Sequence, residues 1–161
     1  METRATVLYM LFVWLAGLTL LLTAALPAHA TSYSYGIAST LNGAQQVPSN
    51  NSMATGAAKA SYDKSTNQLA VTITVAGLTT SQLTASHIHL GATGTSGGIL
   101  VDLGTAGWAN TTSGMTLTTA VSFPEANEID LLNGNTYFNL HTTTYTGGEI
   151  RGQIVVSATL V

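Results

Sequence analysis

The sequence contains no cysteine at all. Disulfide bonds, thiolate metal sites and thiol nucleophiles are therefore excluded, and so is anchoring through a lipid-modified cysteine. Stability must come from an apolar core and from hydrogen bonding alone. The 161 residues are enough to bury such a core in a single domain.

Charged residues are also scarce, at 7% of the sequence, and the formal net charge is −3. Only Lys59, Lys64 and Arg151 carry positive charge after the first thirty residues. A nucleic-acid-binding surface needs concentrated positive charge, so we expect no nucleic-acid partner. The remaining composition, rich in Thr, Ser, Ala and Gly, has too little charge for a disordered chain and is typical of an extracellular β-protein.

One long apolar run occupies residues 8–26, and the small-x-small triplet Ala28-His29-Ala30 follows it closely. This order is typical of a signal peptide and its cleavage site. We expect residues 1–30 to be a signal peptide cut after Ala30. Residues 31–161 would then form one secreted, periplasmic or cell-surface domain without a stable membrane span. The alternative is an uncleaved N-terminal anchor, because the run is nearly long enough to cross a bilayer.

After this run, short apolar–polar alternations are separated by turn residues, a pattern typical of strands in a sandwich or barrel. The clearest alternation covers residues 69–75. Residues 124–132 fit a short helix that starts at Pro124 and stops at Asn133-Gly134. We predict an all-β fold, either a Greek-key β-sandwich or a flattened barrel of about eight strands resembling superoxide dismutase, with one short helix. The strands are expected at 35–41, 54–62, 69–75, around 87–90, and at 99–103, 115–121, 136–141 and 149–158, and loops at 63–67, 91–98 and 104–113, the last with Trp108 capping one end of the core.

Three of the four histidines lie in these predicted strands. His87 and His89 are two residues apart, so their side chains share one face of their strand. Asn139 and His141 share a face in the same way, opposite to Leu140. We expect these polar side chains on the more solvated face of the sheet. There, His87, His89 and His141 can bind one copper or zinc ion and leave a further coordination position open.

Glu149 and Arg151 follow the same two-residue spacing near the end of the domain. We interpret Arg151 as a fixed positive charge beside the metal site that attracts small anions, with Glu149 as its counterion and Asn139 as a neighbouring polar group. A purely structural interpretation stays open. In it, His87 and His89 donate hydrogen bonds to loop carbonyls, and Glu149 and Arg151 form an ion pair on the outer face.

Several motifs together resemble the CHRD (chordin) domain family. The resemblance covers nearly all of residues 41–156, and the motifs occur in the family's order. It implies a single-domain extracellular protein of the kind that bacteria secrete, related to the domains of chordin, an antagonist of growth-factor signalling. We therefore expect a non-catalytic binding or matrix module with an extracellular protein or matrix partner. The motifs are Leu41-Asn42-Gly43-Ala44-Gln45-Gln46-Val47-Pro48, Ala85-Ser86-His87-Ile88-His89-Leu90-Gly91, Leu140-His141-Thr142 and Gly147-Gly148-Glu149-Ile150-Arg151-Gly152-Gln153.

A weaker similarity is to Cu,Zn superoxide dismutase, which also carries a His-x-His on a strand, a later histidine and a late arginine. His87, His89, His141 and Arg151 follow that order, but the chain lacks the bridging histidine, the zinc-binding set and the disulfide of that family. This similarity implies an alternative function, a metal-dependent redox enzyme with Arg151 guiding the anion. A purely structural or adhesive surface protein is the third possibility, and the sequence does not indicate an oligomeric state.

Overall fold

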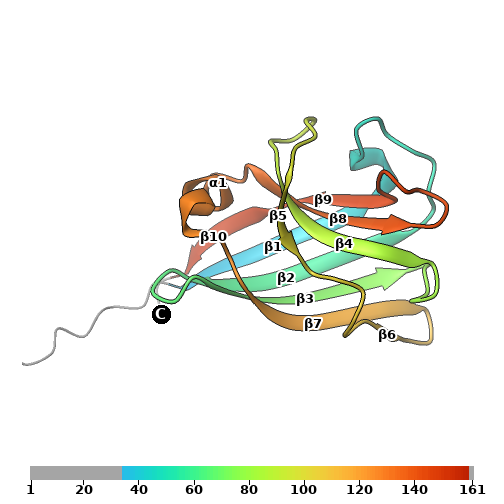
Figure 1. Cartoon of the computed structure of the whole chain (residues 1–161), viewed down its shortest axis with the longest axis horizontal. Helices are drawn as coiled ribbons and strands as arrows, with labels where there is room; N and C mark the ends of the chain where they lie inside the picture. Colours follow the sequence, from blue (N-terminus) through green and yellow to red (C-terminus); the bar gives the residue numbers. More distant parts are fainter. Residues whose placement is uncertain (1–33, 160–161) are drawn as a thin grey trace, which may run out of the picture.

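The computed structural model describes residues 34–159, with side chains described up to residue 157, so the predicted signal peptide lies outside the described residues. The described chain is antiparallel β-structure with one short α-helix and two 3-10 turns, which confirms the predicted all-β fold (Figure 1). The elements are β1 Ser34–Asn42, η1 Gly43–Gln45, β2 Thr55–Asp63, β3 Gln68–Ala76, β4 Leu83–Leu90, β5 Ile99–Asp102, β6 Ala109–Asn110, β7 Gly114–Ser122, η2 Glu125–Asn127, α1 Glu128–Leu132, β8 Thr136–Thr142, β9 Ile150–Gln153 and β10 Val155–Thr159.

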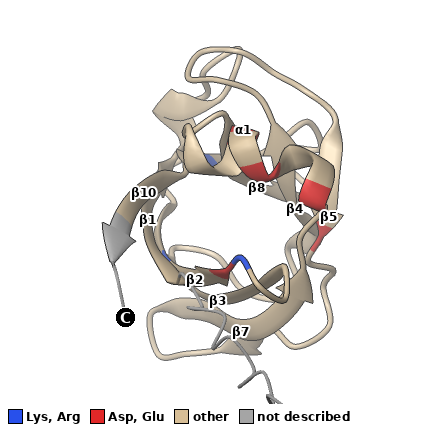
Figure 2. Cartoon of the chain, turned by 90° about the vertical axis from the view of Figure 1, so that its left-hand side faces the viewer, with Lys and Arg blue, Asp and Glu red and all other residues tan. Residues whose placement is uncertain are grey.

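The strands form one sheet in the order β5-β4-β8-β9-β1-β2-β3-β7-β6, and β10 pairs with β1. The sheet is strongly curled. Figure 2 shows the strands around a curve: β10 and β1 lie in its middle, β2 and β3 continue it on one side, and β8, β4 and β5 form the opposite side. This curled sheet is the flattened barrel that the strand pattern predicts, and it places β4 and β8 in the wall opposite β2 and β3.

The alternation in β3 shows how the core forms. Leu69, Val71, Ile73 and Val75 are buried, and the residues between them are exposed. Side chains on the inner face of the opposite wall meet them, and each large apolar side chain buried in this way contributes about 1.5–3 kcal/mol. The inner face of that wall includes Ile88, Val101, Phe138, Leu140 and Ile150.

The predicted strand 149–158 is divided in two at Ile154, because β9 pairs with β8 whereas β10 pairs with β1. The side chain of Gln45 fills the place where β1 changes partner. Its Nε2 donates to the carbonyl of Thr40 at 2.7 Å, and its Oε1 accepts from the backbone N–H of Gln153 at 3.1 Å. The described residues form ten strands, whereas the sequence pattern predicted eight. This division accounts for one of the two additional strands.

The other extra strand is β6, which lies within the predicted loop 104–113 and has only two residues. A strand this short leaves no alternation in the sequence, so the pattern could not reveal it. Trp108, just before it, belongs to the core and is 8% exposed. Its indole Nε1 donates to Oγ of Ser86 on β4, which fixes the connection between β5 and β6 against the sheet.

The predicted helix 124–132 begins later than expected, because Pro124 keeps an extended backbone and a 3-10 turn precedes α1. Leu131 is the residue of this helix whose side chain is buried in the core. Glu128 accepts hydrogen bonds from Nζ of Lys64 at 2.6 Å and from the hydroxyl of Tyr62 at 3.1 Å. These contacts hold α1 beside the β2–β3 hairpin, at the end of the barrel that faces the viewer in Figure 2.

Gly152 on β9 provides a test of the packing between β9 and β1. A Cβ at this position would lie 2.3 Å from Oγ of Ser39 and 2.6 Å from the carbonyl oxygen of Thr40. Because the second contact is backbone, the two strands would have to separate. We expect Gly152→Ala to lower the free energy of unfolding by about 3 kcal/mol, measured by urea denaturation.

The matched control is Gly98→Ala, because a Cβ at Gly98 meets open space. We expect this variant to change the free energy of unfolding by less than about 0.5 kcal/mol. Equal denaturation midpoints for Gly152→Ala and Gly98→Ala would show that β9 does not pack tightly on β1.

Candidate metal centre

The antiparallel pairing of β4 with β8 brings together the three histidines that the sequence singled out. In this register, His87 lies opposite Asn139 and His89 lies opposite Tyr137. The ring centroid of His87 lies 5.3 Å from that of His89 and 5.0 Å from that of His141, and the remaining pair is 5.9 Å apart. One ring nitrogen of each histidine lies within 4.8 Å of those of the other two.

Two of the rings have their tautomer fixed by loop carbonyls. Nδ1 of His89 lies 3.0 Å from the carbonyl oxygen of Gly97, and Nδ1 of His141 lies 2.9 Å from that of Thr146. A carbonyl oxygen can only accept a hydrogen bond, so each Nδ1 carries the hydrogen and each Nε2 carries the lone pair. Such outer hydrogen bonds are the usual way in which proteins orient metal-binding histidines.

The third ring, His87, lies beside a carboxylate. Its Nε2 lies 3.7 Å from Oδ1 of Asp102 on β5, the strand next to β4, which is longer than a hydrogen bond. Nδ1 of His87 and Nε2 of His89 are both buried, and neither has a hydrogen-bond partner. Buried polar atoms without a hydrogen-bond partner are costly and uncommon, so these two ring nitrogens call for a functional explanation.

Burial also sets the protonation of the histidines. Desolvation lowers the pKa of both His87 and His89 below the ordinary value of 6.5, and the neighbouring ring of His141 lowers both further. The hydrogen bond to Gly97 opposes this shift at His89 without reversing it. Both rings are therefore neutral at pH 7, and neutral imidazole is the form that binds a metal ion.

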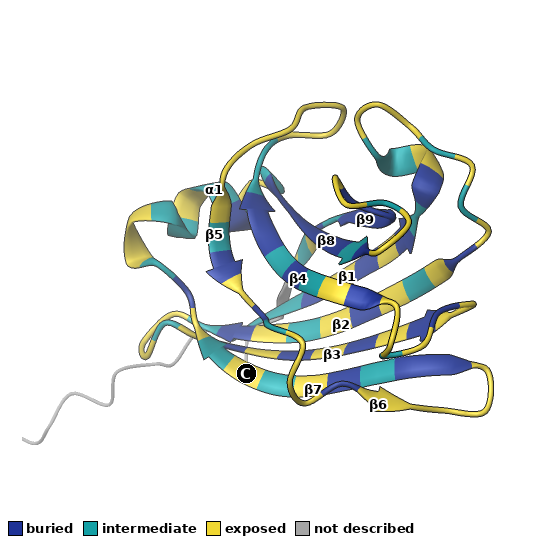
Figure 3. Cartoon of the chain, turned by 45° about the vertical axis from the view of Figure 1, so that its right-hand side comes forward, coloured by how far each residue is buried: buried dark blue, intermediate teal, exposed yellow. Residues whose placement is uncertain are grey.

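The expectation of a solvated face was wrong for His89, Asn139 and Arg151, whereas His87 and His141 are partly exposed. His89 is 8% exposed, Asn139 4% and Arg151 2%. Loops 43–53, 91–98 and 143–149 contribute hydrogen bonds to this face and lie over it. Figure 3 shows these mostly exposed loops around the buried parts of β8 and β9. The alternation correctly separated the two faces of the sheet, but it held no information on what covers the outer face.

Arg151 holds one of these loops rather than facing solvent. Its two terminal nitrogens donate to the carbonyl oxygens of Thr95 at 2.7 Å and Ala92 at 3.0 Å. Its Cζ lies 3.5 Å from the ring centroid of Tyr137, a cation–π contact that stabilises a desolvated guanidinium. Tyr137 in turn stacks on His89, with centroids 5.0 Å apart. Arg151 therefore anchors the loop that supplies the carbonyl to His89.

The predicted pairing of Glu149 with Arg151 was also wrong. The carboxylate of Glu149 accepts hydrogen bonds from Oγ1 of Thr142 at 2.5 Å and Oγ of Ser52 at 2.6 Å. No ion pair joins it to Arg151 in the part of the chain that the structure describes. The reason is local: β9 begins only after Glu149, and Gly148 has a φ of +128°, so the strand alternation does not extend to Glu149.

Sequence reasoning did not assign several residues to this site. Tyr137 shares the phase of Asn139 and His141, so the two-residue spacing was a signal that could have identified it. The structural interpretation correctly expected His89 to donate to a loop carbonyl, which is that of Gly97, but no sequence signal marks the carbonyl of Thr146 as the partner of His141. Their role depends on loop conformations that only the folded chain has.

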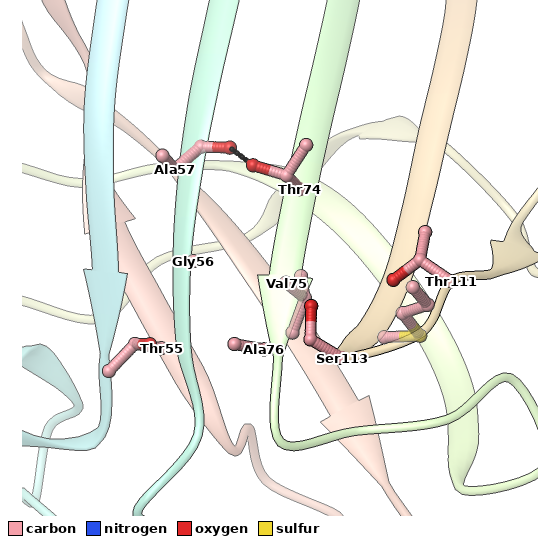
Figure 4. A pocket seen from close by; sticks show the side chains of 9 residues that line it. Thr55, Gly56, Ala57, Thr74, Val75, Ala76, Thr111 and Ser113 are labelled. Carbon is pink, nitrogen blue, oxygen red and sulfur yellow. Dashed lines mark hydrogen bonds between the residues drawn. The ribbon is translucent and has the colours of Figure 1, made fainter.

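One surface hollow lies away from the histidines. It has a volume of about 430 Å³ and lies where β2, β3 and β7 run side by side (Figure 4). Thr74 donates there to the carbonyl oxygen of Ala57 at 3.4 Å. None of the lining residues is titratable, so this hollow offers no acid, base or metal ligand. They are Thr55, Gly56, Ala57, Thr74, Val75, Ala76, Thr111, Ser113 and Met115.

The lowered pKa values predict how the stability of the metal-free protein depends on pH. The unfolded chain binds protons at His87 and His89 below about pH 6.5, whereas the folded chain resists them. Their contribution to stability is complete above that pH and is lost as the pH falls below it. We expect the free energy of unfolding, measured with urea and a chelator present, to fall from pH 7 to pH 5.

The control for this pH dependence is the double variant His87→Gln/His89→Gln, in which the fall between pH 7 and pH 5 should be smaller. An equal fall in the double variant would assign the pH dependence to other groups.

The chain matches the model of the CHRD domain over residues 37–154. No curated protein and no solved structure matches it. Among the described residues, the helical segments are too short to span a bilayer. The match covers most of the sequence and runs from within β1 to the end of β9, so it includes the histidines on β4 and β8. The chain therefore belongs to the CHRD domain family.

Proposed function

We propose that this protein is a secreted CHRD-domain binding module that holds a single copper or zinc ion at His87, His89 and His141. The CHRD match supports a binding module. The observation that carries the metal site is the pair of buried ring nitrogens, Nδ1 of His87 and Nε2 of His89, that lack a hydrogen-bond partner. These two histidines lie beside a third, His141, and one ring nitrogen of each of the three lies within 4.8 Å of the others.

The donor set fits such an ion. Imidazole nitrogen binds both copper and zinc well, and three imidazoles from two strands leave a further position for an exogenous ligand. The rings of His89 and His141 are already oriented by hydrogen bonds to the carbonyls of Gly97 and Thr146. Binding would thus require little reorganisation, and the ion would satisfy the two buried ring nitrogens at the same time. When bound, the ion would supply a Lewis-acidic centre at the edge of the loops.

The residues around His87, His89 and His141 support the site indirectly, by fixing the loops that cover it. We assign Tyr137 and Arg151 to fixing the 91–98 loop and the plane of His89. Glu149 joins β8 to the 43–53 loop through its bonds to Thr142 and Ser52. Because the terminal nitrogens of Arg151 bind loop carbonyls, this residue serves the architecture of the site rather than the capture of anions.

The proposed location is outside the cytoplasm, in the medium, the periplasm or at the cell surface. The apolar run and the Ala28-His29-Ala30 triplet support export, and the extracellular setting of CHRD domains agrees with it. A folded core without cysteine functions equally well in an oxidising environment. We propose an extracellular protein or matrix component as the partner, on the basis of family membership alone.

The similarity to superoxide dismutase gains no support from the described residues. His87, His89 and His141 are the one cluster of three metal-ligating groups found between residues 34 and 159, so a second metal site of that family's type is not provided. A superoxide-dismutation assay on the copper-loaded protein separates the two functions. We expect a rate no greater than that of the same concentration of free copper, and a faster rate would favour the enzyme.

The metal site is tested by loading the purified protein with copper or zinc, followed by elemental analysis. We expect one ion per chain and a higher melting temperature, because the ion binds only the folded state. His87→Ala and His89→Ala should each weaken binding by at least about 100-fold, since even residues that only support a metal ligand contribute 10- to 100-fold.

A suitable control is Gln68→Ala, a change at an exposed position on β3. It should bind metal as the unmodified protein does. A His87→Ala protein that melts at a lower temperature but keeps its full metal content would show that the histidine is structural and that the ion lies elsewhere.

A further inference from the structure

The three ring nitrogens that we assign to the metal are not equivalent. Nδ1 of His87 and Nε2 of His89 have no hydrogen-bond partner, whereas Nε2 of His141 lies 3.2 Å from Nδ2 of Asn139. Because Nδ1 of His141 donates to the carbonyl of Thr146, its Nε2 carries the lone pair and accepts this hydrogen bond. The lone pair that a metal ion would use on His141 is thus already engaged by an amide of the protein.

The orientation of the Asn139 amide is determined on its other side by Gln46. Nε2 of Gln46 donates to Oδ1 of Asn139 at 2.7 Å, so Nδ2 of Asn139 must face His141. The reverse orientation would place Oδ1 against the lone pair of His141 and break the bond to Gln46. A chain of donors therefore runs from the 43–53 loop to the third histidine.

The amide pair is also tightly packed. A Cβ on Gly148 would lie 2.6 Å from Oδ1 of Asn139 and 2.7 Å from Nε2 of Gln46, so the backbone of the 143–149 loop lies directly against both groups. Asn139 is almost completely buried. Its amide cannot turn over unless the Gln46 contact is given up.

We propose that Asn139, oriented by Gln46, competes with the metal ion for Nε2 of His141 and thereby sets the metal affinity of the site. This inference rests on the proposed metal-binding function. It assigns a role to the second glutamine of the Leu41–Pro48 motif, which holds the competing amide in place. A ligand or partner that moved Gln46 would strengthen metal binding without touching a histidine.

The opposite role for Asn139 would be to position the ring of His141 for the metal. The structure does not require it, because the hydrogen bond to Thr146 already fixes that ring. The two roles predict effects of opposite sign. Removal of a competitor tightens metal binding, whereas removal of a positioning residue weakens it.

The test measures the Zn²⁺ affinity of the full protein by competition with a chromophoric chelator. Asn139→Ala removes the competing donor and should tighten binding on the order of fivefold, as expected for the loss of one neutral hydrogen bond. Gln46→Glu places a carboxylate, which only accepts, against Asn139. The amide should then turn its Nδ2 to the carboxylate and away from His141, which removes the competing donor from the lone pair of His141 and tightens binding.

The matched control for added charge is Gln45→Glu. This neighbour lies in the same motif, but its amide contacts Thr40 and Gln153 instead of Asn139. It should tighten binding less than Gln46→Glu does. In an Asn139→Ala background, Gln46→Glu should have no greater effect than Gln45→Glu. A second readout needs no metal: in the metal-free protein, the ¹⁵N resonance of His141 Nε2 should shift toward that of a free lone pair in Asn139→Ala.

The outcomes separate this inference from the proposed function. Zinc binding that is unchanged or weaker in both Asn139→Ala and Gln46→Glu, with both proteins folded, would overturn the competition and leave the metal site standing. A native protein that binds neither zinc nor copper would overturn the metal site and the competition together. Tighter binding in both variants, with a smaller effect of Gln45→Glu, is the result that we expect.

Discussion

The pairing of β4 with β8 is the constraint on which the candidate site depends. The same two strands place Ile88, Phe138 and Leu140 in the core and His87, His89 and His141 on the outer face. A slip of one residue in either strand would expose apolar side chains and separate the imidazoles, at the cost of the core. Burial of the core therefore fixes the register that keeps the three histidines together, so the proposed ligands are in place before an ion binds.

The outer face becomes a site because loops close over it. Glycines permit the closest approaches: a Cβ on Gly97 would lie 1.7 Å from the carbonyl oxygen of Leu90, so only glycine lets this loop present its carbonyl to His89. Arg151 holds the same loop in place. Burial desolvates its guanidinium, which is unfavourable, and the contacts with the Tyr137 ring and the loop carbonyls partly offset this desolvation. Burial of this face lowers the pKa of His87 and His89 and keeps both neutral.

The motifs that the chain shares with its family have a common structural meaning. In the opening motif, Gln45 bridges the place where β1 changes partner, and Gln46 holds the amide beside His141. In the closing motif, Glu149 joins β8 to the 43–53 loop, and Arg151 joins β9 to the 91–98 loop. Each of these polar residues connects a loop to the sheet on the side of the histidines. The residues of both motifs therefore support the same site, because they hold the loops around the histidines.

The sequence by itself determined which residues face inward and which outward, because strand geometry has a period of two residues that hydrophobicity records directly. From this period came eight of the strands and the three histidines as a group, whereas the single helix was marked by Pro124 and Asn133-Gly134 at its ends. The tertiary structure alone decided the register of β4 against β8, the loops that bury the outer face, and the partners of Glu149 and Arg151. It also decided which imidazole nitrogens keep a lone pair. These depend on contacts between segments far apart in the chain, and no local pattern of residues encodes such contacts.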